Sequence, residues 1–504
     1  MRATPSDLTA IAGATDSMPV RQRHAPSSRD DTVGTQLWHG RHVALMAGIG
    51  LLLGLHRAEA ALDSDTLWSA RYGMDVLSSG RLPRSDTYSW TAFGHQWIPS
   101  SWGWNLALGA AYRGAGLLGI WLVGIALAVG LAIAVAHAAA RIAAPPLPTA
   151  LLFAVLGGVA LVVAPRAQTI GYVLVLAIPP VLAPVLYRGR AQALPAAAAL
   201  CGLQVLWMNL HSSALLGPAL IAVGGIGLLL RPAQRPGRAV RRLARLAAVV
   251  VATAACCLAT PYGAGPVLHV RAVRSASVGL INEWDHPGFG NFAQLVSLIA
   301  IAVAVLASWL AYRSRRFDTA GILLLLVAAT ASAIRFAPMI VVFAIPELAA
   351  ALGILKVRPF MFRRIVAAVC AVLGVFAIAN VRTFARRSTN LASPRLVAAL
   401  PRDCHVANDY TLGATVILLR PDVRVSIDGR NDMYGRALVL SAVAMLEDSP
   451  GTAAKLHAAR VNCVLAPSSA PLVAGLSHDS DWHVVGHDGY RTLLVRTGTS
   501  PAGG

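Results

Sequence analysis

The sequence predicts a polytopic α-helical membrane protein with a small α/β domain at its C-terminus. Charged residues make up only 13% of the 504 residues, whereas hydrophobic residues make up 56%. A soluble globular domain carries about 25% charged residues. The apolar residues form runs of roughly 17 to 25, the length that a helix needs to cross the hydrocarbon of a bilayer. These observations exclude a soluble enzyme, a nucleic-acid-binding protein and a disordered scaffold as descriptions of the whole chain.

The N-terminal 42 residues differ from the rest of the chain. They are polar, rich in Ser, Thr, Asp and Arg, and show no apolar periodicity. We therefore expect residues 1–42 to form a disordered cytoplasmic tail. The apolar runs after this tail predict about eleven transmembrane helices, at 43–60, 115–139, 147–164, 169–187, 192–209, 213–230, 244–260, 293–312, 319–334, 337–355 and 364–380. Three prolines inside the fourth run predict a kinked helix, which neighbouring helices tolerate in a membrane.

Lysine and arginine residues set the expected orientation. If the N-terminus is cytoplasmic, the inner loops hold 21 of them and the outer loops hold 9. Cytoplasmic loops carry the excess of positive charge in membrane proteins, so this orientation is favoured. The net charge of +20 is thus spread over loops and does not form a patch for a nucleic acid. The abundance of Arg and Ala is typical of a GC-rich bacterial genome, which points to a bacterial inner membrane.

Residues 381–504 change in composition and, after an odd number of spans, are expected to be extracytoplasmic. Charges return, and β-like runs alternate with helical runs, which predicts a small α/β domain. The β-like runs are Val423–Ile427, Val461–Ala466, Trp482–Gly486 and Thr492–Arg496, and the helical runs are about 410–419, 437–447 and 469–476. Cys404 and Cys463 both fall in this domain. An oxidising compartment would permit a disulfide between them, but the sequence leaves their pairing open.

The first outer loop, about 61–114, is the longest polar connection in the membrane part. Asp63 and Asp65 follow the first span directly, where a carboxylate is costly unless it faces a cavity or a cation. Two acids at this spacing could bind a divalent cation, or one could serve as a general base. The alternative is a helix N-cap, for which Asp is common. The sequence contains no metal-ligand spacing such as C-x-x-C or H-E-x-x-H.

Further polar residues map to the outer ends of the predicted spans. Arg166 and Arg335 break the positive-inside pattern there, and amide, acid and imidazole side chains fall on the same side. Each has an ordinary explanation alone, such as a lipid headgroup contact. Together, outer arginines beside outer carboxylates are what a site for a lipid-linked phosphate requires.

Several short motifs carry a resemblance to a known superfamily. The first outer loop reads D-S-D-T-L-W and then S-G-R-L-P-R-S-D-T-Y-S-W-T-A-F-G-H-Q-W-I. There follow N-L-H at 209–211, P-Y-G at 261–263, E-W-D-H-P at 283–287 and R-F-A-P at 335–338, and the tail contains N-D-Y-T-L-G and D-G-R-N-D-M-Y-G. In this order, from about residue 60 to the C-terminus, they resemble the bacterial polytopic glycosyltransferase-like proteins of the C-type (GT-C) superfamily.

The resemblance implies interfacial helices in the first outer loop above a membrane cavity. It also implies a polyprenyl-phosphate sugar as donor and a catalytic acid in that loop, which Asp65 or Asp63 matches. The sequence departs from the group at Ser69, where the group has His, and at Ser212, where Gly is frequent.

Our first hypothesis is a membrane glycosyltransferase that moves a hexose or pentose, with inversion, to an extracytoplasmic glycan, lipid or protein. Asp65 would be the base, and Asp63 would orient it or share a divalent cation. Arg335 and Arg166 would hold the donor phosphate. The predicted residues for binding sugar or acceptor are Asn209, His211, Glu283, Trp284, Asp285, His286, Asp409, Tyr410, Asp428 and Arg430.

Two other classes of protein stay open. A transporter or flippase of a lipid-linked precursor would show internal repeats and polar residues at the bilayer midplane. No repeat is visible, and Glu347 is the one clear acidic residue inside a predicted span, where it could also pair with an arginine. The third possibility is a non-catalytic envelope-assembly protein of the same fold.

Overall fold

The computed structural model describes residues 28–159, 165–230, 236–354, 359–389, 393–448 and 452–498. The chain divides into two units, with the boundary between Arg41 and His42. Residues 1–27 of the predicted disordered tail lie outside the described residues. Helix α1 (Ser28–His56) begins within the rest of this segment, and the disordered cytoplasmic tail stays a prediction. A nucleated helix extends at low cost, since each added residue contributes one hydrogen bond.

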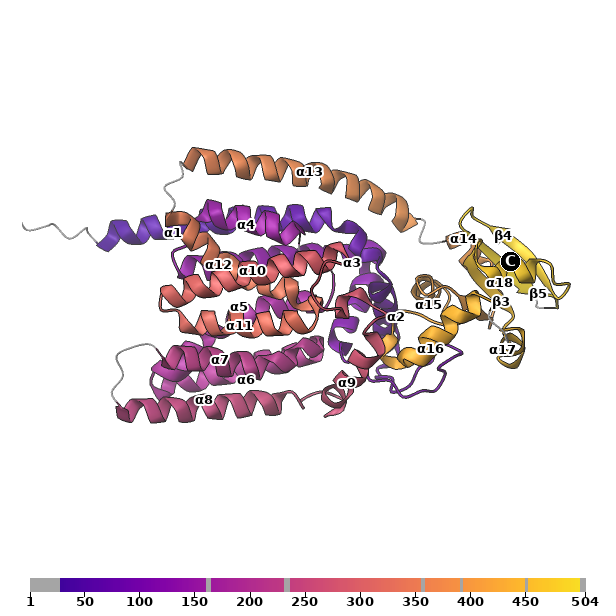
Figure 1. The fold of residues 1–504 in the computed structure, drawn as a ribbon, viewed down its shortest axis with the longest axis horizontal. Coiled ribbons are helices and arrows are strands. Elements are labelled where there is room, and N and C mark those ends of the chain that lie inside the picture. Colours follow the sequence, from indigo (N-terminus) through magenta and orange to yellow (C-terminus); the bar gives the residue numbers. More distant parts are fainter. Residues whose placement is uncertain are drawn as a thin grey trace, which may run out of the picture. The chain divides into compact units, whose positions relative to one another are not determined.

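All the named elements of the described chain as far as residue 389 are helices (Figure 1), and the residues between α2 and α3 form a loop. All eleven predicted spans overlap helices of this part. After α1 the elements are η1 (Ala58–Leu62), α2 (Ser64–Ser79), α3 (Trp102–Arg141), α4 (Pro146–Val159), α5 (Gln168–Tyr187), α6 (Arg190–Leu210), η2 (Ser212–Leu216), α7 (Gly217–Leu229), α8 (Pro236–Cys256), α9 (Gly265–Ser277), η3 (Asn282–Trp284), α10 (Phe292–Arg313), α11 (Phe317–Ser332), η4 (Ile334–Phe336), α12 (Ala337–Ile354) and α13 (Pro359–Thr389).

Seven segments of the described chain are long and apolar enough to cross a membrane. They are Trp102–Arg141, Gln168–Tyr187, Arg190–Leu210, Ser212–Leu229, Phe292–Arg313, Ile334–Gly353 and Arg363–Arg386. Three shorter apolar helices, Gly40–His56, Pro146–Val159 and Phe317–Ser332, accompany them. Helix α8 is in neither group because its first half is basic. The protein is therefore a multi-pass helical membrane protein, while the number eleven stays a prediction.

The buried acid of the membrane part has an arginine partner. Glu347 of α12 is 2% exposed, and the Nε of Arg316 lies 2.9 Å from its Oε1. Arg316 is the residue that precedes α11, at one end of the bundle. A buried carboxylate needs such a cation to offset the cost of desolvation. Of the two roles that the sequence left open for Glu347, the ion pair is the one that its contacts favour.

Helix α2, which carries Asp65, is held against the first part of α3 by two glycines. A side-chain carbon on Gly73 would lie 1.9 Å from the carbonyl oxygen of Asn105, and one on Gly109 would lie 2.4 Å from the carbonyl carbon of Gly73. Only glycine permits so close a helix crossing. Helix α3 is interrupted at Gly116, whose φ is 57°. The first outer loop is therefore largely helical, as the resemblance implied.

The C-terminal domain, residues 393–498, contains a five-stranded sheet of order β2-β1-β3-β5-β4. Strand β1 (His405–Asn408) pairs in parallel with β2 (Arg424–Val425) and β3 (Cys463–Pro467), and β5 (Arg491–Arg496) is antiparallel to β3 and β4 (Trp482–His487). The helices are α14 (Pro394–Ala398), α15 (Gly413–Leu419), α16 (Asn431–Leu446), α17 (Thr452–Ala458) and α18 (Pro471–Ser477). The α/β prediction is confirmed, although the sequence missed β1, a central strand of only four residues.

The first outer loop pairs with the edge of this sheet. The backbone N–H of Val425 donates to the carbonyl of Tyr88 at 3.1 Å, and the N–H of Trp90 donates to the carbonyl of Val425 at 3.0 Å. The indole of Trp90 reaches further and donates to the carbonyl of Val406 at 3.0 Å. The loop thus covers an edge that would otherwise expose unpaired backbone groups. It also ties the C-terminal domain to the membrane part.

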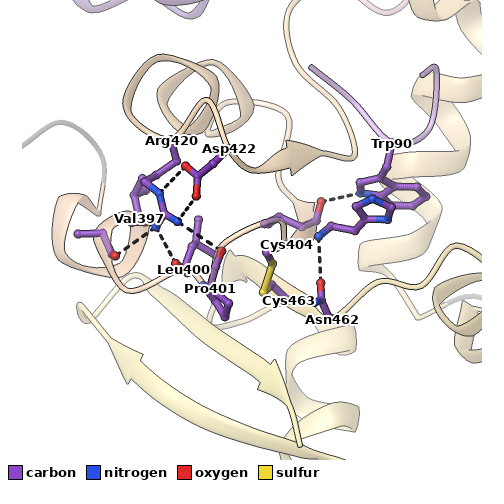
Figure 2. The surroundings of a disulfide bond; sticks show 12 residues. Trp90, Val397, Leu400, Pro401, Cys404, Arg420, Asp422, Asn462 and Cys463 are labelled. Carbon is purple, nitrogen blue, oxygen red and sulfur yellow. Dashed lines mark hydrogen bonds and ion pairs between the residues drawn. A yellow bond between two sulfur atoms is a disulfide. The ribbon is translucent and has the colours of Figure 1, made fainter. Parts of the chain in front are cut away.

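Cys404 and Cys463 form a disulfide, with their Cα atoms 6.3 Å apart (Figure 2). The bond joins the residue before β1 to the first residue of β3. Nearby, Arg420 pairs with Asp422 and donates to the carbonyl of Leu400 at 2.6 Å. The disulfide therefore links two neighbouring strands at a point where the surrounding loops are also held by hydrogen bonds.

Replacing both Cys404 and Cys463 by Ser is expected to destabilise the C-terminal domain. The bond closes a loop with a sequence separation of 59, for which the chain-entropy relation gives about 4 kcal/mol. Thermal unfolding of the full-length protein, followed by proteolysis within residues 393–498, measures the change. Cys201→Ser is the control, because Cys201 is a free thiol of α6. Unchanged unfolding of the double variant would show that the disulfide contributes nothing.

Candidate active site

A cavity of about 370 Å³ lies where α2, α3, α9 and the C-terminal domain come together. The end of α6, η3 and η4 also contribute to its wall. Eight of the predicted site residues line it, and they come from distant parts of the chain. They are Asp63, Asp65, Arg166, His211, Glu283, Trp284, Arg335 and Tyr410. The sequence therefore identified most of the charged groups that the fold brings to this cavity.

Asp63 is the N-cap of α2, and both of its carboxylate oxygens are engaged. Oδ1 accepts the backbone N–H of Asp65 at 3.0 Å, and Oδ2 lies 2.6 Å from Nη2 of Arg166. Arg166 also pairs with Glu283, so one guanidinium bridges two acids. Burial lowers the pKa of Arg166, but the carboxylates of Glu283 and Asp63 outweigh it and raise that pKa above its ordinary value. The N-cap alternative thus describes Asp63 correctly.

Asp65 differs from Asp63 in its surroundings. Its side chain opens into the cavity, is exposed there, and forms no ion pair with any described residue; Oδ1 accepts the indole N–H of Trp68 at 3.3 Å. The protein groups around the cavity partly desolvate this carboxyl and raise its pKa to about 6, while Arg166 opposes the shift and Asp63 adds to it. A carboxylate with that pKa, within reach of a ligand, can accept a proton near neutral pH.

Arg335 is the cation that remains available in the cavity. Its guanidinium lies 4.3 Å from the centre of the Trp284 ring, and within the described ranges it pairs with no carboxylate. Nearby, the ring of His211 accepts the backbone N–H of Ser213 at 3.1 Å. Burial and the charge of Arg335 lower the pKa of His211 to about 3. The imidazole is therefore neutral, and Arg335 supplies the positive charge.

The C-terminal domain closes one side of the cavity. A side-chain carbon on Gly429 would lie 2.7 Å from Oδ1 of Asp65, so a larger residue there would displace that carboxylate. Next to it, the amide of Asn431 donates to the hydroxyl of Tyr410 at 2.7 Å. The amide of Asn408 donates to the carbonyl of Ile427 at 2.9 Å. The Asp-Gly-Arg and Asn-Asp-Tyr segments are therefore neighbours.

Asp428 and Arg430 do not face the cavity. Their side chains are fully buried and paired at 2.6 Å, and Arg430 Nη1 also lies 2.5 Å from Oδ1 of Asp86 in the first outer loop. The hydroxyl of Tyr434 donates to Asp428 at 2.6 Å. The prediction that these two residues bind substrate is corrected accordingly. They hold the C-terminal domain onto the loop, and their neighbour Gly429 is the residue that reaches the cavity.

Four other predicted residues also lie outside the cavity lining. The side-chain amide of Asn209 already has hydrogen-bond partners. Its oxygen accepts the indole N–H of Trp102 at 2.8 Å, and its nitrogen donates to the backbone carbonyls of two neighbouring turns. His286 Nδ1 lies 3.0 Å from the carbonyl of Ala331. Asp409 pairs with Arg491 at 3.0 Å. The carbonyl of Asp285 accepts the N–H of Ile334, next to Arg335. These residues fix the segments that carry the cavity groups.

Sequence reasoning missed a second polar wall of the cavity. His269 of α9 faces Asp432 of α16, with 3.9 Å between Nε2 and Oδ2. Both line the cavity, as do Asn105 and Asn431. Within the part of the chain that the structure describes, buried polar atoms without a hydrogen-bond partner include His269 Nε2, Asn431 Oδ1 and both amide atoms of Asn105. Such atoms are costly to bury and suit a ligand rich in hydroxyl groups. In the sequence, the only pattern that could have pointed to His269 as a cavity residue is its helical spacing within α9.

The two loop carboxylates do not form a metal site as a pair. Asp63 has both oxygens engaged, which leaves Asp65 alone to offer free lone pairs. Across the described ranges no group of three or more His, Cys, Asp or Glu side chains is placed to hold a metal ion. The predicted divalent cation is therefore not supported by the donor set, and we derive no catalytic step through a metal.

Comparison with known proteins identifies the fold. No family model matches the sequence, and no curated protein matches it. The structure is similar to the oligosaccharyltransferase of Archaeoglobus fulgidus in the apo form, with a TM-score of 0.54 and 10% identity, over 85% of this chain and 69% of that one. It is also similar to ArnT of Cupriavidus metallidurans bound to undecaprenyl phosphate, with a TM-score of 0.50 and 13% identity, over 91% of this chain and 98% of that one. The chain therefore has the fold of the membrane glycosyltransferases of the C-type (GT-C) superfamily.

Proposed function

We propose that the protein transfers a sugar from a polyprenyl-phosphate donor to an extracytoplasmic acceptor. The observation that carries this is the presence, in one cavity, of a carboxylate at Asp65 and a guanidinium at Arg335 that form no ion pair with any described residue. Undecaprenyl phosphate, the ligand bound to one structural relative, supports the donor class. The cavity residues of this chain suit that donor, since a phosphate needs a cation and a sugar needs hydrogen-bonding groups.

In the proposed reaction Asp65 accepts the proton of an acceptor hydroxyl. The acceptor oxygen attacks the anomeric carbon of the sugar, with inversion, and the bond from that carbon to the phosphate oxygen breaks. The polyprenyl phosphate departs with the bonding electron pair, and Arg335 stabilises its charge. Arg166 contributes through Asp63, which it holds as the cap of the helix that carries Asp65. Asn105, Asn431 and His269 would bind hydroxyl groups of sugar or acceptor.

Release of undecaprenyl phosphate tests the proposal. Purified protein incubated with undecaprenyl-phosphate-linked pentoses and hexoses should release the lipid phosphate, whereas a flippase would move the donor intact. Arg335→Gln should lower kcat/KM about 10- to 100-fold, because a hydrogen bond to a charged group contributes about 1.5–3 kcal/mol. Arg84→Gln is the control, since Arg84 does not line the cavity. No release from any donor, or full activity of Arg335→Gln, would contradict the proposal.

We also propose that the N-terminus is cytoplasmic, that the C-terminal domain is extracytoplasmic, and that the membrane is a bacterial inner membrane. The 21 to 9 distribution of Lys and Arg supports this, and the disulfide agrees with an oxidising compartment. A reporter that is active only outside the cytoplasm should be active when fused after Thr389, at the end of α13. The reciprocal cytoplasm-only reporter is the control, and its activity at that junction would invert the orientation.

A further inference from the structure

A second cavity lies at the opposite end of the membrane helices. It has a volume of about 390 Å³ and is formed by α6, α8 and the end of α5. Arg190, the first residue of α6, lies at this cavity, whereas the C-terminal end of α6 leads to His211 in the candidate active site. The 21 residues of α6 span about 30 Å at 1.5 Å per residue. The two cavities are therefore separate sites.

Small apolar side chains line most of this groove. Helix α6 contributes Ala193 and Ala197, and α8 contributes Ala248 and Ala252. On each helix these positions are four residues apart, so they form a stripe along one face. Short side chains on two facing helices leave a narrow apolar channel, which has the cross-section and chemistry to accept a hydrocarbon chain.

Arginines stand at the same end of both stripes. Arg190 is three residues before Ala193 on α6, and Arg245 is three residues before Ala248 on α8. Each stripe thus runs from a guanidinium to small apolar residues over successive turns of the same helix face. Arg245 also donates to the carbonyl of Arg188 at 2.9 Å, which anchors it to the end of α5. This order, cation first and apolar channel next, is the order of an anionic headgroup and its acyl chain.

The three helices that form this groove contain no acidic residue. Residues 87–282 contain no Asp or Glu. No described carboxylate pairs with Arg190 and Arg245, which line the cavity, or with Arg188, Arg241 and Arg242, which lie close to them along the chain. Arg242 lies 4.6 Å from the centre of the Tyr187 ring, which orients its guanidinium without neutralising it. Guanidinium groups bind phosphate through several hydrogen bonds at once.

We propose that the groove between α6 and α8 binds an anionic phospholipid. One acyl chain lies along Ala197 and Ala252, and the phosphate is held by Arg190, Arg242 and Arg245. The positive-inside bias explains why arginines occur in these loops, but it does not explain why they stand at the mouth of an apolar channel between two helices. The site is independent of the proposed sugar transfer, because it involves none of the residues of the first cavity.

Native mass spectrometry of the delipidated full-length protein tests the site. Phosphatidylglycerol should be retained at an at least tenfold lower concentration than phosphatidylcholine with the same acyl chains. The double variant Arg190→Gln/Arg242→Gln should lose that preference, since arginines near a membrane surface attract anionic lipid. The matched control is Arg313→Gln/Arg364→Gln, which removes two arginines that stack on aromatic rings at the ends of α10 and α13.

The contribution of the channel is tested separately. Ala252→Phe fills the groove and keeps every arginine, so it should also abolish selective retention of phosphatidylglycerol. Glycerol 1-phosphate, which has the headgroup phosphate but no acyl chain, should not displace the lipid. Unfolding temperatures measured without lipid verify that each variant is folded. Equal retention of the two lipids, loss of the preference in the control variant, or displacement by glycerol 1-phosphate would overturn the proposal.

Discussion

Asp65→Asn is expected to lower kcat by about 10²-fold or more, because general base catalysis contributes roughly 10²- to 10⁴-fold. The amide keeps the shape of the side chain but cannot accept the proton of the acceptor. Binding of undecaprenyl phosphate should be retained, since the cation proposed for it is Arg335. Asp285→Asn is the matched control, because Asp285 does not line the cavity. A fully active Asp65→Asn protein would exclude Asp65 as the base.

The pH dependence of the same variant gives a second test. The pKa of Asp65 is raised to about 6, so the base is protonated, and inactive, as pH falls through that value. The wild-type kcat/KM should therefore decline below about pH 6 and level off above it. In Asp65→Asn this acidic limb should disappear from the residual activity. An identical limb in both proteins would assign the titration to another group.

Arg430→Met is expected to destabilise the protein by about 3–5 kcal/mol, because it leaves buried carboxylates without a cation. Arg430, Asp86 and Asp428 are all fully buried, and they join the C-terminal domain to the first outer loop. Chemical unfolding and limited proteolysis of the full-length protein measure the loss. Activity should fall as well, since Gly429 would no longer be held beside Asp65.

An exposed ion pair provides the control for this prediction. Arg496 and Asp481 lie 3.5 Å apart, with 34% and 64% of their side chains exposed. Arg496→Gln should therefore change the free energy of unfolding by less than about 1 kcal/mol. If Arg430→Met were equally mild, the buried pairs would not be what holds the domain to the loop.

The membrane part could be predicted well because lipid imposes a strong constraint on sequence. A helix that crosses a bilayer must be apolar along its whole length, so every predicted span overlaps a helix. The first predicted span begins at residue 43, whereas α1 begins at Ser28, because polar residues give no signal that a helix extends into them. Strand β1 was missed, because four residues are too few to show a period.

Residues of the candidate site could be predicted where a charged side chain stands at a position that is unusual for a membrane protein. Arg166 and Arg335 stood out because they break the positive-inside pattern, and Asp65 stood out because a carboxylate at the end of a span is costly unless it faces a cavity or a cation. Asp428 and Arg430 stood out equally but are buried, since sequence cannot distinguish a charge that faces a ligand from one that faces another charge. His269 and Asp432 belong to different elements, and only the folded chain brings them together.

The contact between Arg430 and Asp86 has a consequence for how the protein is made. The two residues are 344 positions apart, so the ribosome, at about 5–20 residues per second, adds Arg430 some 20–70 s after Asp86. During that interval the first outer loop lacks Arg430, the strand edge at Val425 and the glycine beside Asp65. The membrane helices are inserted before the last wall of the cavity exists. A nascent or truncated chain therefore carries the charged groups of α2 without the surface that confines them, and the site becomes complete only when the final strands have been translated and folded.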